Sequence, residues 1–155
     1  MGARLSPVIG LILFGTCFVF ADDTQTDSKA LQGKWVAVMA EEMGDKASDH
    51  ELKRKPTILE ITDKKLVISF GKDDRREFSM ELDASTDPKH IDLHHAEPNS
   101  VTHGIYKLED GIFTLCVEHH LHPNGKEDRP VEFRTDKNSK NAGLKLLRID
   151  FVKKS

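Results

Sequence analysis

Cysteine is scarce in this sequence: the 155 residues contain two, Cys17 and Cys116. Cys17 lies in an N-terminal apolar segment that we expect to be removed, which leaves Cys116 as the one thiol of the mature chain. A single thiol cannot form a disulfide within the chain. The sequence therefore excludes a disulfide-stapled scaffold, and the fold must be stabilised by packing and hydrogen bonds.

A strong excess of one charge is also missing. The chain has 23 Lys and Arg against 26 Asp and Glu, a formal net charge of -3, which becomes -4 when Arg4 is removed with the N-terminal segment. The two signs are mixed along the chain rather than gathered in blocks. This pattern argues against nucleic acid or a membrane surface as the partner.

The first 21 residues are typical of a secretion signal. Arg4 gives them a positive start, residues 7–20 are almost wholly apolar, and Ala21 precedes Asp22, so we expect cleavage between these two residues. The apolar run of about 14 residues is shorter than the roughly 20 that cross a bilayer, so no stable membrane span is expected after cleavage. The sequence predicts an exported protein, either periplasmic or secreted.

The mature chain has the length of one domain. Residues 22–27, "DDTQTD", are polar and predict a flexible leader, and residues 28–155 predict a single domain with its own core. Ser28 begins "SKALQGKW", a helical turn that Gly33 can end at little cost in a left-handed conformation. The stretch "SDHELKRK" predicts a short helix after the first strand.

Short stretches of alternating apolar and polar residues fill the rest of the domain. Asp110-Gly111 between two of them is a strong hairpin signal. Eight or nine such strands joined by short turns predict an all-antiparallel barrel or sandwich. The expected strands are residues 34–40, 56–62 and 65–71, then "RREFSMELD", "HIDLH", "VTHGIYKLE", "GIFTLCVEH", "PVEFRT" and "LKLLRIDFVK".

Two sets of motifs resemble known families. The opening "LQGKWVAVMAEEMG" resembles the glycine-x-tryptophan start of lipocalin-like barrels. The order "LQGKW", "ELKRKPTILEIT", "DPKHIDL", "GIYKLEDGIFTLCV", "DRPVEF" and "LKLLRIDF" is similar to a family of small, uncharacterised exported domains abundant in planctomycete bacteria. The resemblance covers nearly the whole mature chain and implies an all-β, lipocalin-like antiparallel barrel of about eight strands. It implies no activity, because that family has none assigned.

The lipocalin resemblance also implies a structural role for Gly33 and Trp35, with the indole closing one end of the barrel beneath an arginine of the last strand. Arg148 in "LLRIDF" is the expected arginine. A guanidinium over an indole face contributes about 0.5 to 2 kcal/mol, depending on its burial. In the other interpretation Trp35 is an ordinary core residue, and both interpretations are structural.

Histidine is abundant, with eight residues, seven of them between His90 and His122. Alternation places Phe113, Leu115 and Val117 on the inner face of their strand and the polar neighbours on the outer face. Hairpin registers then place Asp92 and Glu118 on either side of His103. The resulting candidate metal site, which would take zinc or copper, comprises His90, Asp92, His94, His103, Glu118, His120 and His122.

A second interpretation of the same residues is a row of solvated polar positions near the rim of the barrel. No HExxH helix or CxxC pair is present, and a slip of one residue in register would scatter the row over both faces. Cys116, within "FTLCV", is typical of an inert packing residue rather than a nucleophile. Asp128 and Arg129 are expected to fix a turn before Pro130 begins an edge strand.

No catalytic motif emerges: the chain has no nucleophile elbow, phosphate loop or dinucleotide fingerprint. Our main hypothesis is therefore a monomeric, non-enzymatic barrel without a cofactor that binds a small apolar ligand or a cell-envelope protein. Side chains can also fill a barrel of this size by themselves. The alternative is a metal-binding histidine face. The inward residues expected to form the wall of a pocket are Ile68, Phe70, Phe78, Met80, Leu115 and Val117.

Overall fold

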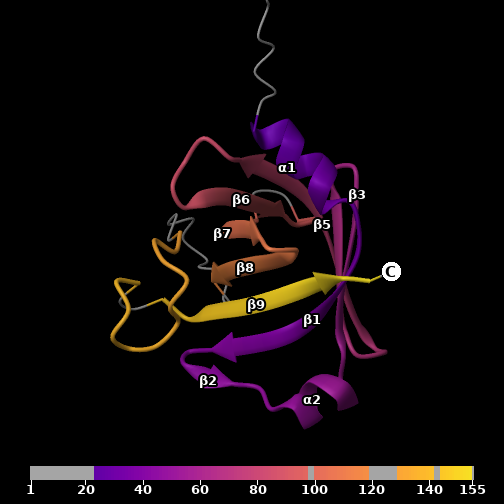
Figure 1. Ribbon diagram of the computed structural model, residues 1–155, viewed down its shortest axis with the longest axis vertical. Coiled ribbons are helices and arrows are strands. Elements are labelled where there is room, and N and C mark those ends of the chain that lie inside the picture. The colour runs from indigo at the N-terminus through magenta and orange to yellow at the C-terminus, as the bar shows by residue number, and fades with distance from the viewer. Residues whose placement is uncertain (1–22, 98–99, 119–128, 142–143, 155) are drawn as a thin grey trace, which may run out of the picture.

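The structure is a computed structural model, and it describes residues 23–97, 100–118, 129–141 and 144–154. These residues contain two helices, one at each end of the molecule (Figure 1), and a single sheet. The helices are α1 (Asp23–Leu31) and α2 (Asp49–Arg54). The strands are β1 (Gly33–Glu42), β2 (Asp45–Lys46), β3 (Thr57–Thr62), β4 (Lys65–Phe70), β5 (Asp74–Asp83), β6 (Lys89–His94), β7 (Val101–Glu109), β8 (Ile112–Glu118) and β9 (Leu146–Lys153).

The sheet closes into an antiparallel barrel. β1 pairs with β3, each later strand pairs with the next, and β9 pairs with β1, while the two-residue β2 adds only a short hairpin to β1. Each of the eight barrel strands therefore has a neighbouring strand on both sides, and none is an edge strand. The predicted all-β, lipocalin-like barrel of about eight strands, with a short helix after the first strand, is confirmed, and the sandwich alternative is wrong.

The helix before the barrel is longer than the sequence predicted. α1 begins at Asp23, so the prediction of a flexible leader over residues 22–27 is wrong from Asp23 onward. Asp27 is buried, and its Oδ2 accepts hydrogen bonds from Lys89 Nζ at 2.7 Å and from Tyr106 Oη at 2.8 Å. The polar composition of this stretch was misleading because the partners of Asp27 lie on distant strands. Residues 1–22 lie outside the described residues, and the signal at 1–21 stays a prediction.

Below α1 the barrel is filled by its own side chains. Trp35 donates from Nε1 to the carbonyl oxygen of Leu31 at 2.8 Å, which ties the end of the helix to the barrel. The indole packs against Phe113, which in turn stacks on Phe151 with ring centroids 6.0 Å apart. Phe113 and Phe151 are 0% exposed and Trp35 is 2% exposed, so this end of the barrel is closed.

The cation beside Trp35 is Lys153 and not Arg148. Lys153 Nζ lies 5.4 Å from the centre of the Trp35 ring and also donates to the carbonyl oxygen of Ala30 at 3.2 Å. Alternation explains the error: Phe151 and Lys153 share the inward face of β9 with Ile149, whereas Arg148 points outward. Arg148 instead forms an ion pair with Asp150, Nη2 to Oδ2, at 2.9 Å.

The predicted strand "PVEFRT" is wrong, because this stretch is an irregular segment with bends and turns. Its backbone is held by the side chain of Asn141, which accepts from the Val131 amide at 2.7 Å and donates to the carbonyl oxygens of Glu132 and Arg134, each at 2.9 Å. The same segment places Phe133 over a second apolar cluster on the outside of the barrel. That cluster consists of Ile105, Cys116 and Leu146.

Candidate ligand cavity

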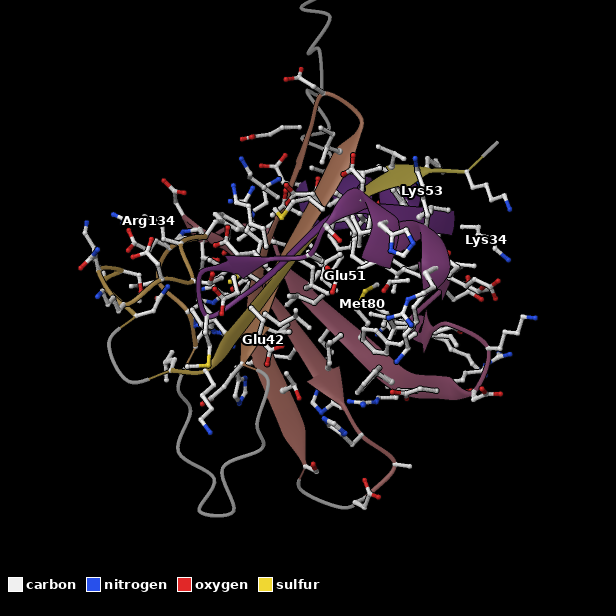
Figure 2. All side chains as sticks on the ribbon, turned by 90° about the horizontal axis from the view of Figure 1, so that it is seen from below. Lys34, Glu42, Glu51, Lys53, Met80 and Arg134 are labelled. Carbon is white, nitrogen blue, oxygen red and sulfur yellow. The ribbon has the colours of Figure 1, made fainter. Side chains whose placement is uncertain are left out.

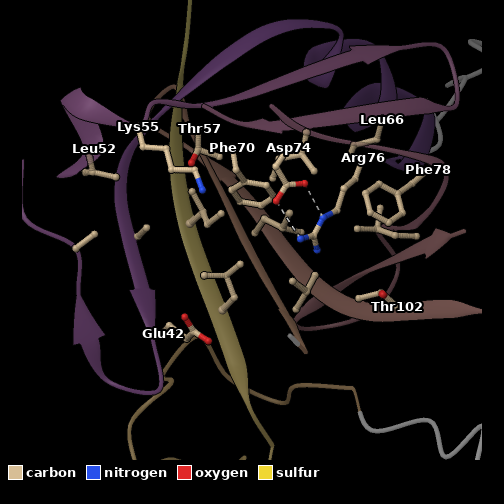
Figure 3. Close-up of a pocket in the computed structure, with 18 of the residues that line it drawn as sticks. Glu42, Leu52, Lys55, Thr57, Leu66, Phe70, Asp74, Arg76, Phe78 and Thr102 are labelled. Carbon is tan, nitrogen blue, oxygen red and sulfur yellow. Dashed lines mark hydrogen bonds and ion pairs between the residues drawn. The ribbon is translucent and has the colours of Figure 1, made fainter. Parts of the chain in front are cut away.

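The end of the barrel beside α2 is hollow. A cavity of about 720 Å³ extends from the open mouth under α2 into the barrel. Its wall is mainly apolar and includes Leu66, Phe70 and Phe78, which are labelled in Figure 3. Ile68, Leu115 and Val117 belong to the same wall. Since the opposite end is filled by aromatic rings, the cavity has one blind end and one mouth.

Five of the six residues predicted to form a pocket wall do so: Ile68, Phe70, Phe78, Leu115 and Val117. The sixth, Met80, is 3% exposed and belongs to the packed core rather than to the cavity. Its central position is visible in Figure 2, where Lys34 and Arg134 lie at the periphery. The alternation of β4, β5 and β8 thus predicted the inward face, but not where along each strand the packing stops.

Two charged residues at the beginning of β5, Asp74 and Arg76, also face the cavity. Asp74 accepts two hydrogen bonds from Arg76, from Nε to Oδ1 and from Nη2 to Oδ2, both at 3.1 Å. The guanidinium carbon of Arg76 lies 5.4 Å from the centre of the Phe70 ring. The hydrogen bonds from Arg76 are the main reason that the pKa of Asp74 is lowered, with Lys55 as a further positive neighbour. The pair places charged groups in the cavity wall beside Phe70.

Lys55 reaches the mouth from the end of α2. Its aliphatic stem lies directly over Gly71, where a Cβ atom would come within 2.9 Å of Lys55 Cγ. Gly71 has φ +74° and donates from its backbone N–H to the carbonyl oxygen of Pro56 at 2.9 Å. A glycine is needed here both for this conformation and for the space that the lysine stem occupies. Figure 3 shows the Lys55 ammonium turned toward the cavity.

His95 and Thr102 form a second polar site in the cavity wall. His95 Nε2 lies 2.8 Å from Thr102 Oγ1, and the imidazole meets the Phe78 ring edge to face with centroids 4.8 Å apart. Burial is the main cause that lowers the pKa of His95; Glu97 opposes this effect and Arg76 adds to it, and the net shift favours the neutral ring. Sequence reasoning missed this residue, although alternation with Ile91 and Leu93 marks position 95 as inward.

The strand register predicted for the histidine face is confirmed wherever β6, β7 and β8 pair with one another. Asp92 lies opposite His103, and His103 Nδ1 is 2.9 Å from Asp92 Oδ1. The hairpin of β7 and β8 has the predicted register up to Gly104 opposite Val117, one step short of His103 and Glu118. The pairing of Asp92 with His103 on the outer wall was therefore readable from turn lengths and alternation.

The third member of this outer group is Arg129, which sequence reasoning had assigned to a turn. Its Nη2 donates to Asp92 Oδ1 at 2.7 Å and lies 3.2 Å from His103 Nδ1, and its Nη1 donates to the carbonyl oxygen of Gly104 at 2.7 Å. Burial alone would raise the pKa of Asp92, but the hydrogen bonds from His103 and Arg129 outweigh it and hold the pKa below its usual value. Arg129 thus fastens its segment to the outer wall.

The predicted metal site around His103 has no support among the described residues. The Arg129 guanidinium occupies one side of Asp92, and among the described residues no group of three His, Cys, Asp or Glu side chains is arranged to hold a metal. His94 instead faces Glu81, Nε2 to Oε2, at 3.5 Å, and burial is the main cause that lowers the pKa of His90. His120 and His122 lie outside the described residues, so their part of the metal hypothesis stays a prediction.

Cys116 is inert packing, as predicted. The thiol is 0% exposed in the outer cluster under Phe133, and burial raises its pKa to about 12. A thiol needs to ionise to act as a nucleophile, and this one faces away from the cavity. Cys116 therefore contributes to stability and not to the chemistry of the site.

Comparisons with known proteins give no family for this chain. No protein-family model matches the sequence, and no curated protein matches it. Among solved structures, apo lipid binding protein 8 of Caenorhabditis elegans is similar, with 13% sequence identity and a TM-score of 0.40 over 81% of this chain and 96% of that chain. The resemblance to planctomycete exported domains accordingly stays a prediction.

Proposed function

We propose that this protein is a non-enzymatic barrel that binds a small, predominantly apolar molecule in the cavity beside α2. The observation that carries the proposal is the cavity itself, about 720 Å³ with a mainly apolar wall. Ligand pockets typically measure about 300 to 1,000 Å³ and combine apolar walls with a few polar groups. Side chains can fill a barrel of this size, as they do at the end closed by α1, but they leave the end beside α2 hollow.

The polar groups of the cavity suit binding better than catalysis. Asp74 is engaged by Arg76, and His95 by Thr102. Within the part of the chain that the structure describes, no carboxylate hydrogen-bonds to the imidazole of His95, so the pair lacks the third member that orients a catalytic base. These polar side chains can orient a bound molecule through hydrogen bonds and charge.

The magnitude of apolar burial sets the expected affinity. Each methylene transferred from water contributes about 0.8 kcal/mol, so an alkyl chain of about twelve carbons contributes roughly 10 kcal/mol at full burial. Association costs about 4 kcal/mol or more. Dissociation constants in the micromolar range, about -8 kcal/mol, are therefore expected once polar contacts are added.

The location of the protein belongs to the same proposal. The signal predicted over residues 1–21 supports an exported protein, periplasmic or secreted, which would meet apolar ligands or proteins of the cell envelope. No helix of the described residues is long and apolar enough to cross a membrane.

Native mass spectrometry of the protein purified from its own host tests the proposal directly, because a carrier should retain a small molecule of defined mass. Displacement of the neutral dye Nile red supplies the second measurement, with Val117→Trp as the blocking variant and Val152→Trp as its matched control. Val117 lines the cavity and Val152 points outward on the neighbouring strand. Val117→Trp should abolish dye binding while Val152→Trp preserves it. Equal binding by both variants, with no co-purified mass, would show that the cavity is not a binding site.

A further inference from the structure

We infer that the ligand carries an anionic head group, held at the mouth of the cavity by Lys55 and Arg76. The inference rests on the proposed function and specifies its chemistry. It begins with Lys55, whose ammonium turns toward the cavity (Figure 3). Among the described residues no carboxylate lies within ion-pair distance of this ammonium, although Lys34, Lys65, Lys89 and Lys107 each have such a partner.

Lys55, Asp74 and Arg76 together carry one positive charge in excess. Lys55 and Arg76 both lower the pKa of Asp74 through their charge, which places the three groups in one electrostatic cluster. Asp74 lies near both cations but accepts hydrogen bonds only from the guanidinium of Arg76. The guanidinium of Arg76 lies over the Phe70 ring, and one additional anion would balance the excess positive charge of this partly exposed cluster.

The remaining carboxylates at the mouth do not supply this anion. Glu42 lies opposite Leu147 and Glu118 opposite Leu146, so both belong to the side of the mouth formed by β1, β8 and β9. Figure 3 shows Glu42 well separated from Lys55 and Arg76. Glu51 is engaged in the capping box of α2, where it accepts from the backbone N–H and hydroxyl of Ser48, each at 2.8 Å. The side formed by α2 and β5 is thus the positive side.

The position of the cluster fixes the orientation of the ligand. Lys55 and Arg76 lie at the mouth, while Leu66 and Leu115 continue the apolar wall toward the closed end. A molecule with an anionic group at one end and an alkyl chain at the other satisfies both regions at once. The chemistry is shared by carboxylates and phosphate monoesters with a single chain, and an uncharged or cationic head would leave Lys55 without a partner.

A matched series of twelve-carbon ligands tests the inference by displacement of Nile red from the purified chain, below the micelle concentrations. The ligands are dodecanoate, dodecyl phosphate, dodecanol and dodecyltrimethylammonium. Both anions should bind more tightly than dodecanol, and the cation most weakly. Lys55→Gln and Arg76→Gln should each weaken dodecanoate about three- to fivefold, as expected for partly exposed ion pairs, and leave dodecanol unchanged. Lys53→Gln, on the same helix but outside the cavity wall, is the control.

Asp74→Asn gives a result in the opposite direction, which loss of folding cannot imitate. Removing the competing carboxylate frees Arg76, so dodecanoate should bind about two- to threefold more tightly. Equal affinity for dodecanoate and dodecanol, or unchanged dodecanoate affinity in the Lys55 and Arg76 variants, overturns the head-group inference while the apolar cavity stands. Failure of all four ligands to displace the dye overturns the proposed function as well. Tighter binding of dodecyl phosphate than dodecanoate assigns the head group to the phosphate class.

Discussion

The contact of Asp27 with the barrel allows the sharpest test of the fold. Asp27 Oδ2 accepts from Tyr106 Oη and from Lys89 Nζ, and all three residues come from different elements: α1, β7 and β6. Asp27→Ala removes both interactions. Because Trp35 donates to Leu31 at the end of the same helix, loosening α1 should also change the environment of the indole.

The expected loss is about 2 to 3 kcal/mol of unfolding free energy. Tyr106 is 0% exposed, so its hydroxyl would remain buried without its acceptor, which costs about 1 to 3 kcal/mol. The side chain of Lys89 is 37% exposed, so water can replace the lost partner and its contribution is at most about 1 kcal/mol. Tyr106→Phe, which removes the buried hydroxyl, should cost about 1 kcal/mol, and the double variant should cost less than the sum of the two single variants.

Urea unfolding at pH 7, followed by far-ultraviolet circular dichroism and by the fluorescence of Trp35, measures these quantities. The chain contains one Trp, so a red shift of its emission in Asp27→Ala reports on α1 directly. Gln25→Ala on an exposed position of α1 is the control and should change stability by less than about 0.5 kcal/mol. A loss in Asp27→Ala no larger than in this control would refute the claim that α1 is anchored through Asp27.

Three further experiments test other parts of the structure. The lowered pKa of Asp92 means that its contribution is present above its unfolded pKa, near 4, and is lost as the pH falls through its lower folded pKa. Asp92→Asn should therefore cost about 1 to 2 kcal/mol in urea unfolding at pH 7 and much less near pH 2. Cys116, with a pKa raised to about 12, should resist iodoacetamide at pH 7 in a Cys17→Ser chain until urea unfolds it; labelling at the rate of a free thiol would contradict its burial. Gly104→Ala should cost about 1 to 3 kcal/mol, because the new Cβ would lie 2.7 Å from Val117 Cγ1 and 2.9 Å from the carbonyl oxygen of Cys116; a variant as stable as the parent would show that this contact is overestimated.

The barrel and much of its register could be predicted because they depend on local signals. The turn at Asp110-Gly111 fixes the hairpin of β7 and β8, and alternation of apolar residues identifies the inward face of each strand. From these two signals the opposition of Asp92 and His103 followed correctly. Local signals suffice here because an antiparallel barrel joins neighbours in sequence by short turns.

The errors have a common physical cause in contacts between distant residues. Asp27 is polar and looked mobile, but its partners lie on β6 and β7. Arg129 looked like a turn residue, but it binds the outer wall 37 positions away at Asp92. The stretch "PVEFRT" alternates like a strand, but Asn141 takes its backbone hydrogen bonds. In each case one specific side chain decides the local structure, and no periodic pattern records that partner.

Inward-facing charges mark the end of the barrel at which the cavity opens. Phe78 and Met80 mark the inward face of β5, and counting back by two places Asp74 and Arg76 on the same face. Charged side chains are rarely fully buried, so two of them on an inward row indicate that the packed core ends before they are reached. Where the core ends inside a closed barrel, the remaining space is open to water or to a ligand. Inward-facing charges near the ends of barrel strands are therefore a sequence signal for an open cavity, and here they are the groups from which we infer the charge of the ligand.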